Sequence, residues 1–251
     1  MNKPLADISS QNYTIKLFKG TPNKSLRIIL CLILCWQSFF VAARNETVFT
    51  DTVKRSTFAE AKIYLRFLPP LDSSSFWPYI KPQYFLENLN MFLSNPLYSF
   101  DNKNTNFCGY TAISFVALEM DPVGYLKFMV ELYNRGEAKM GKSFFKPSLR
   151  VREHAGKLKY KGMLDINPAT QMWFLTLADH YKGYLNVLNT RFHENDENKM
   201  WAATNFAKFN RMLRKLFDWK VHAKGADLVH PPIADIYSYL EEKLKTGIVF
   251  L

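Results

Sequence analysis

The dipeptide Asp121-Pro122 constrains the fold more than any other feature of this 251-residue sequence. Aspartate is a preferred N-cap residue, and proline is favoured at the first helical position because its missing N–H costs no hydrogen bond there. The apolar residues that follow keep helical spacing as far as Gly136, a typical helix terminator. Proline also ends the apolar helical pattern that begins near Cys108. The sequence therefore predicts two consecutive helices that meet at residue 121.

Other helix signals are distributed along the chain. Asn167-Pro168 repeats the cap-and-proline start and predicts a third helix. Before Cys108, many aromatic residues and a high density of prolines predict an irregular layer packed on the core. Helical periodicity predicts three more helices, over residues 84–93, 199–217 and 233–245.

Strand signals are weaker and fall mainly near the end of the chain. Residues 219–223 alternate in polarity, and residues 248–251 are continuously apolar, so both indicate short strands. Residues 137–166 are basic, glycine-punctuated and loop-like, with weak strand potential. Because 48% of the residues are hydrophobic, the chain has enough apolar surface for a packed core.

An apolar run over residues 28–43 follows a basic N-terminal stretch. This layout predicts a cleaved export signal, with Val41-Ala42-Ala43 as the cleavage site, or an uncleaved membrane anchor with its basic side in the cytoplasm. A buried core helix is the third interpretation, since the run is shorter than the about 20 residues of a typical spanning helix. We therefore expect a leader or anchor (1–43), a polar tether (44–60) and a folded domain (61–251), located outside the cytoplasm or at a membrane.

The formal net charge of +11 is partly a property of this leader. Five basic residues and one acidic residue within 1–43 contribute +4, which leaves +7 for residues 44–251. A moderately basic domain favours anionic surfaces or acidic proteins. A basic cluster spans residues 139–161, but it carries no nucleic-acid module and no aromatic ladder. We expect these charges to be solvated and expect no nucleic-acid partner.

Cys108 is the candidate reactive group. Cys31 and Cys35 lie inside the apolar run, so Cys108 would be the single cysteine of an exported domain, where a lone thiol is a candidate nucleophile. It opens a predicted helix, where unpaired N–H groups and the helix dipole favour a thiolate. The alternative is a small buried core residue.

A cysteine nucleophile also needs hydrogen-bond donors for the oxyanion that forms during acyl transfer. The backbone N–H of Cys108 is the first candidate donor. An upstream amide is the second, from Asn102, Asn104 or Asn106. Gly109 has no Cβ, so it would let a substrate backbone pass close to the sulfur.

The chain resembles papain-like cysteine peptidases, in particular bacterial toxin or effector domains in which Cys-Gly opens the central helix. The similar stretches are Asn106–Ala112, Asp121–Tyr125 and Leu132–Gly136. The resemblance covers the chain from about residue 100 to its end. It implies a papain-like α+β fold, helix-rich with a small C-terminal antiparallel sheet, and it aligns the family's upstream amide, usually glutamine, with Asn102.

In the same family the catalytic histidine opens a strand after the cysteine helix. The tail of this chain resembles the segment just before that strand, and no histidine follows it. The resemblance therefore implies a sheet that is incomplete and a truncated, inactive enzyme unless another histidine substitutes. His222, on a predicted strand, is the best substitute base, and His230 is a second. The other three are expected at the surface or at caps: His154, His180 and His193.

The first functional hypothesis is thus an exported or membrane-anchored bacterial cysteine hydrolase (peptidase, amidase or deamidase) that acts through a thioester. Its catalytic residues would be Cys108, Asn102 and His222, its substrate a protein or peptide, and residues 28–43 would contact the membrane. Two alternatives are a non-catalytic interaction module that keeps the fold and a helical membrane-associated protein with Cys108 in its core. No pair of histidines has metal-ligand spacing and the folded domain has one thiol, so we expect neither a metal nor a cofactor.

Overall fold

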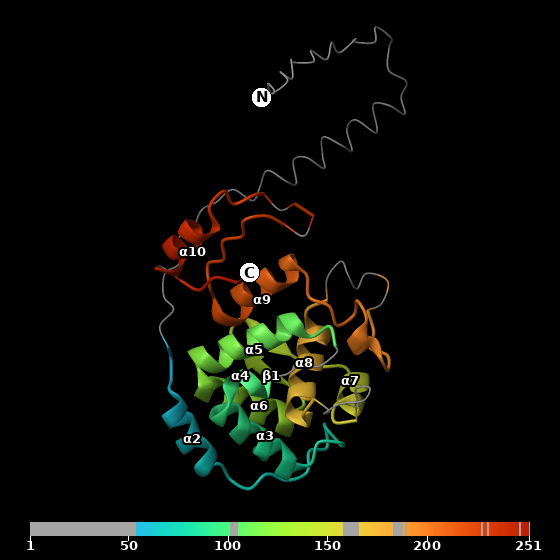
Figure 1. Ribbon diagram of the computed structural model, residues 1–251. Coiled ribbons are helices and arrows are strands. Elements are labelled where there is room, and N and C mark those ends of the chain that lie inside the picture. The colour runs from blue at the N-terminus through green and yellow to red at the C-terminus, as the bar shows by residue number, and fades with distance from the viewer. Residues whose placement is uncertain are drawn as a thin grey trace, which may run out of the picture. The chain divides into compact units, whose positions relative to one another are not determined.

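The computed structural model describes residues 54–100, 105–157, 166–182, 188, 190–226, 228–229, 231–245 and 247–250 (Figure 1). The chain divides into two units, Met1–Glu46 and Thr47–Leu251, and every described residue belongs to the second. The predicted leader or anchor therefore lies outside the described residues. Among the helices that are described, none is long and apolar enough to cross a bilayer.

The described domain is helix-rich α+β, as predicted, with a small antiparallel sheet. The sheet pairs β1 (Ala138–Met140) with β2 (Ser143–Phe145), so its place is the middle of the chain, whereas a C-terminal sheet was expected. The helices are α2 (Phe58–Arg66), α3 (Pro82–Ser94), α4 (Pro96–Ser99), α5 (Cys108–Met120), α6 (Pro122–Arg135), α7 (Leu149–His154), α8 (Pro168–His180), α9 (Phe206–Phe217) and α10 (Ile236–Leu244), with the 3-10 turn η2 at Asp196–Asn198.

The predicted helix starts at Asp121 and Asn167 are confirmed. The Asp121 carboxylate accepts a hydrogen bond from the N–H of Gly124 at 2.9 Å, which caps α6. The Asn167 side chain accepts one from the N–H of Thr170 at 2.8 Å, which caps α8. α6 ends at Gly136, whose φ of 67° is the left-handed conformation that favours glycine. These ends follow from local chemistry, which explains why sequence predicted them.

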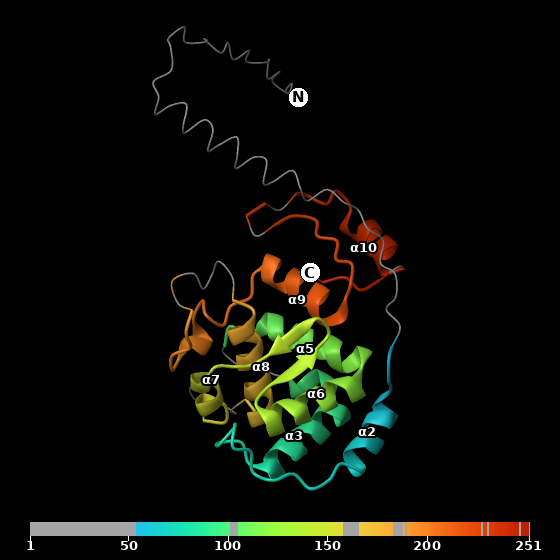
Figure 2. The ribbon, with the colours of Figure 1, turned by 180° about the vertical axis from the view of Figure 1, so that it is seen from behind.

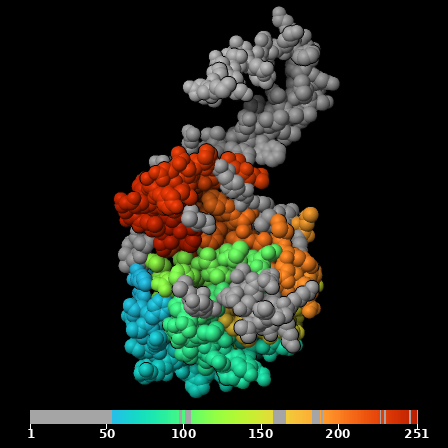
Figure 3. Space-filling model, viewed as in Figure 1, coloured from blue at the N-terminus to red at the C-terminus, as the bar shows by residue number. Residues whose placement is uncertain are grey.

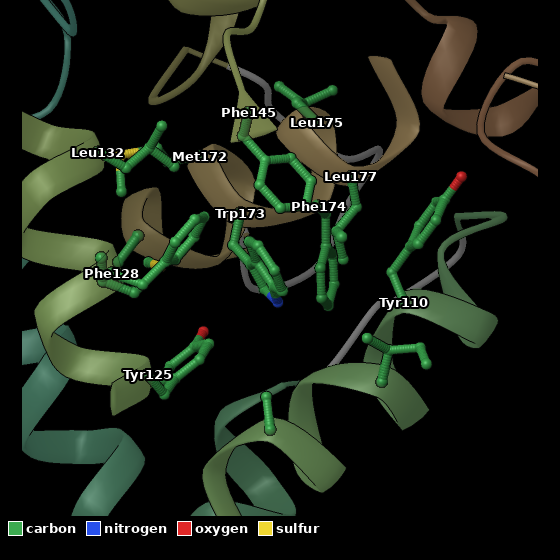
Figure 4. Close-up of a cluster of buried hydrophobic side chains, with 14 of the residues drawn as sticks. Tyr110, Tyr125, Phe128, Leu132, Phe145, Met172, Trp173, Phe174, Leu175 and Leu177 are labelled. Carbon is green, nitrogen blue, oxygen red and sulfur yellow. The ribbon is translucent and has the colours of Figure 1, made fainter. Parts of the chain in front are cut away.

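Helix α8 is the centre of the core. All ten residues from Ala169 to Ala178 are buried, because α3, α5 and α7 contact this helix from different sides. The views in Figures 1 and 2, from the front and from behind, show it surrounded by the other elements. Trp173 is fully buried, and its Nε1 donates to Ser114 Oγ of α5 at 2.6 Å. Figure 4 shows its ring among the aromatic side chains of Tyr125, Phe128 and Phe145.

The proline-rich segment before α3 is an irregular layer on this core, as predicted. Trp77 is fully buried and donates from Nε1 to the Leu132 carbonyl at 2.7 Å. In return, the Tyr133 hydroxyl donates to the Ile80 carbonyl at 2.9 Å. In this layer, hydrogen bonds from side chains to backbone carbonyls take the place of the regular backbone hydrogen bonds of a helix or strand.

The first described residues pack on the domain before the predicted boundary at residue 61. The Arg55 N–H donates to the Met120 carbonyl at 2.8 Å, and Ser56 Oγ donates to the Asp121 carboxylate at 2.5 Å. Thr57 then caps α2 in a capping box with Glu60. The ordered domain therefore includes residues that were expected to belong to the tether.

Four predictions for the C-terminal third were wrong: the helix starts at residues 199 and 233, and the strands over residues 219–223 and 248–251. α9 begins at Phe206 rather than at residue 199, because the Asn205 side chain accepts from the Lys208 N–H at 2.7 Å and fixes the cap there. Residues 219–223 and 248–250 form no strand, since neither segment pairs with a neighbouring strand in the described part of the chain. α10 begins at Ile236, buries none of its residues, and belongs to a segment that lies on the outside of the domain beside α9 (Figure 3).

Candidate functional site

Cys108 is the first residue of α5, as predicted, and it is exposed. The N-cap residue, Phe107, offers no side-chain hydrogen bond to the helix. The N–H groups of Tyr110 and Thr111 donate to the Phe107 carbonyl at 2.9 and 3.0 Å. The N–H groups of Cys108 and Gly109 precede the first intrahelical bonds, and among the described residues no acceptor pairs with them, so they can donate to a negatively charged group beside the exposed thiol.

Of the three asparagines upstream of Cys108, the structure describes one. Asn102, the expected second oxyanion donor, and Asn104 lie outside the described residues, so that role stays a prediction. Asn106 has a different role: its N–H donates to the Glu197 carbonyl at 3.0 Å and its Nδ2 to the Lys199 carbonyl at 3.1 Å. It therefore fixes the segment around η2 to the start of α5.

Gly109 is required for packing. A Cβ added at this position would lie 2.6 Å from Thr204 Cβ and 2.7 Å from Thr204 Cγ2, distances that real side chains do not adopt. The segment before α9 thus occupies the space that was expected to admit a substrate backbone. A substrate could approach the thiol only from the exposed side of Cys108.

Replacing Gly109 with alanine is expected to lower the free energy of unfolding by about 1–3 kcal/mol, because Thr204 must shift. The double variant Gly109→Ala/Thr204→Gly removes the opposing side chain and should recover most of that loss. Urea unfolding of the wild type, both single variants and the double variant measures the coupling. Additive single effects would show that the two residues do not compete for the same space.

A buried cation lies behind the first turn of α5. Lys208 of α9 is 2% exposed, and its Nζ donates to the Tyr110 hydroxyl at 3.2 Å and to the Ala203 carbonyl at 2.7 Å. Burial, with a smaller contribution from the Arg211 charge, lowers the Lys208 pKa from 10.5 to about 8. Burial also raises the pKa of Tyr110. Burial removes part of the hydration of both groups. The hydrogen bond between Lys208 and Tyr110 joins α9 to α5.

This lowered pKa makes stability depend on pH. Between pH 8 and 10.5 the unfolded chain binds more protons at Lys208 than the folded chain, so the Lys208 contribution to stability rises with pH across this window. Relative to Lys208→Met, which cannot titrate, the wild type should gain about 2 kcal/mol of unfolding free energy between pH 7.5 and 9.5. Urea unfolding of both proteins measures the difference, in which other titrating groups cancel. Parallel pH profiles would contradict it.

Cys108 and the segment that leads to His222 lie at opposite ends of α5. Trp219, three residues before His222, lines a cavity with Met120 at the C-terminal end of the helix. Cys108 is at the N-terminal end, twelve residues and about 18 Å away along the axis. The geometry therefore gives no support to His222 as the base for Cys108. His230, the second substitute, lies outside the described residues.

A different histidine is connected to the start of α5. His193 donates from its N–H to Asp196 Oδ2 at 2.8 Å, and its Nδ1 lies 3.2 Å from the same oxygen. The Asp196 side chain is 1% exposed and also accepts from Lys199 Nζ at 3.2 Å. Since the next residue, Glu197, bonds to Asn106, the His193–Asp196 pair belongs to a segment joined to the residue two before Cys108.

The sequence predicts His193 at the surface or at a cap, and its side chain is indeed 55% exposed, but its contact with Asp196 was not predicted. The available signal was the spacing His193-x-x-Asp196, which suits a turn in which one carboxylate orients an imidazole. The remaining described histidines, His154 and His180, make contacts within the fold. His154 Nδ1 lies 2.8 Å from the Arg150 carbonyl, and the His180 ring packs on Phe145 with a centroid separation of 4.5 Å. Burial lowers the pKa of His180.

Within the described ranges, no group of three or more histidine, cysteine or acidic side chains is arranged to hold a metal ion. Comparison of the chain with protein-family models, with curated proteins and with solved structures finds no match. Functional inference therefore depends on the site itself.

Proposed function

We propose that this protein is a papain-like cysteine hydrolase that acts on amide bonds of a protein or peptide, with Cys108 as nucleophile. One observation carries the proposal: the thiol is exposed at the first residue of a 13-residue helix whose N-cap provides no side-chain hydrogen bond. Backbone donors and the positive helix end beside a thiol favour the oxyanion that forms during acyl transfer. Export or anchoring through residues 28–43 belongs to the same proposal.

His193 is the base that we infer, in place of His222. Its Nδ1 is close to the buried Asp196 carboxylate, which leaves Nε2 to accept a proton. The thiol proton passes to Nε2, and the sulfur bonds to the substrate carbonyl carbon. The C–N bond then breaks as the imidazolium protonates the leaving amine. Water hydrolyses the thioester, which releases the acid and restores the thiol.

The second candidate is a non-catalytic interaction module. The position of Trp219 at the end of α5 opposite Cys108 favours it, because the segment that leads to His222, the expected base, then starts from the other end of that helix. In this case the thiol would behave as an ordinary exposed cysteine.

Alkylation separates the two candidates. If the hydrolase proposal holds, wild-type protein should react with iodoacetamide at pH 6 at least about tenfold faster than free cysteine, because a neighbouring base assists attack by the sulfur. The modified residue is identified by mass spectrometry, and Cys108→Ser is the labelling control. A rate equal to that of free cysteine would contradict the hydrolase and favour the interaction module.

Two matched histidine variants identify the base. His193→Gln should reduce the rate at pH 6 to near that of free cysteine, whereas His222→Gln should leave it unchanged. Asp196→Asn should give an intermediate loss, since it removes the charge that orients His193. The opposite pattern, with only His222→Gln slow, would return the role of base to His222.

A further inference from the structure

A pocket of about 190 Å³ lies at the end of α5 opposite Cys108. It is bounded by the end of α5, the start of α6, the β1–β2 turn and the end of α9. Its position, about 18 Å from the thiol along the helix, separates it from the proposed catalytic site. The apolar part of its wall comprises Ala117, Met120, Met140, Leu216, Phe217 and Trp219.

The size and the wall suit one aromatic ring with a short chain. An apolar cavity of about 150 Å³ in another protein holds benzene, so this pocket can hold a ring with a few more atoms. Methionine side chains adapt to the outline of a ligand, and their sulfur atoms contact aromatic rings favourably. The Phe217 and Trp219 rings, 5.1 Å apart between centroids, add an aromatic surface to the wall.

The charges around the pocket select for an anion. Arg55 and Lys139 both belong to the lining and are exposed, and neither forms an ion pair with a described residue. The carboxylate of Asp121 also lines the pocket, but it already accepts hydrogen bonds from Ser56 Oγ at 2.5 Å and from the Gly124 N–H at 2.9 Å. The lining thus carries two cations and one carboxylate that already accepts hydrogen bonds, so the net charge at the pocket is positive.

We propose that this pocket binds a small aromatic carboxylate, with the ring against the Met, Phe and Trp side chains and the carboxylate near Arg55 and Lys139. Such a ligand matches both the apolar wall and the positive entrance, whereas a neutral ligand uses only the wall. An amine is disfavoured, because it would approach both cations. This site is independent of the proposed hydrolase activity.

Three probes with one ring and one chain length test the charge. Equilibrium dialysis of the full-length protein should show saturable binding of 3-phenylpropanoate. The neutral 3-phenylpropan-1-ol should bind about fivefold more weakly, and 3-phenylpropylamine weaker still. Arg55→Gln and Lys139→Gln should each weaken the acid about 2- to 5-fold and leave the alcohol unchanged. Lys62→Gln, an exposed lysine of α2 outside the pocket, is the matched control and should change neither.

The location is tested by fluorescence. Bound acid should change the emission of Trp219, and Trp219→Phe should abolish that change. The alkylation rate of Cys108 should be the same with and without the acid, so failure of this site and failure of the hydrolase proposal are distinguishable. Absence of saturable binding, equal binding of acid and alcohol, or an equal effect of Lys62→Gln would each overturn the proposal.

Discussion

Replacing Trp173 with alanine is expected to lower the free energy of unfolding by about 4 kcal/mol, in the range for a large aromatic residue removed from a core. The ring is fully buried at the centre of α8 and packs edge-on against Tyr125 and Phe128, with centroid separations of 5.8 and 5.1 Å. The surrounding rings belong to α6 and β2, which are held by their own contacts, so they cannot all move to fill the cavity. Chemical denaturation of wild type and variant measures the difference.

Trp173→Phe is the matched control. It keeps most of the ring volume but removes the 2.6 Å hydrogen bond from Nε1 to Ser114 Oγ, so it should cost about 1–2 kcal/mol. Ser114 Oγ retains its own bond to the Tyr110 carbonyl at 2.6 Å, which limits the loss. If the phenylalanine variant were as unstable as the alanine variant, the hydrogen bond and not the packing would dominate.

The parts of this fold that the sequence predicts are those fixed by neighbouring residues. Asp121, Asn167 and Gly136 act on backbone groups within four positions, so their effects do not depend on the rest of the fold. The alternation in residues 219–223 is different, because a strand needs a partner and the described chain provides none there.

The candidate site shows the same limit. The position of Cys108 at a helix start is local and was predicted. The close packing of Gly109 on Thr204, 95 positions later in the chain, is not local, and glycine alone cannot distinguish a substrate channel from a tight contact. Helical periodicity over residues 199–217 predicts a polar face that includes Lys208, yet Lys208 is buried against Tyr110. A pattern of polar and apolar residues cannot predict burial of a long charged side chain that finds hydrogen-bond acceptors inside the protein.

Replacing Gly141 with alanine is expected to cost about 3 kcal/mol or more, for two reasons that add. Gly141 has a φ of 56°, and this left-handed conformation costs a residue with a Cβ about 1–2 kcal/mol. An added Cβ would also lie 2.3 Å from the Leu216 carbonyl oxygen, a backbone atom that cannot rotate away. Chemical denaturation measures the loss.

Asparagine at position 141 separates the two causes. Asparagine tolerates the left-handed conformation better than alanine, so Gly141→Asn would restore stability if backbone strain were the main cost. We expect no restoration, because its Cβ meets the same Leu216 carbonyl. The N–H of Lys142, the next residue, donates to the Lys215 carbonyl at 2.7 Å, which holds the turn against α9. An asparagine variant within about 0.5 kcal/mol of wild type would show that the turn can move away from α9 at little cost.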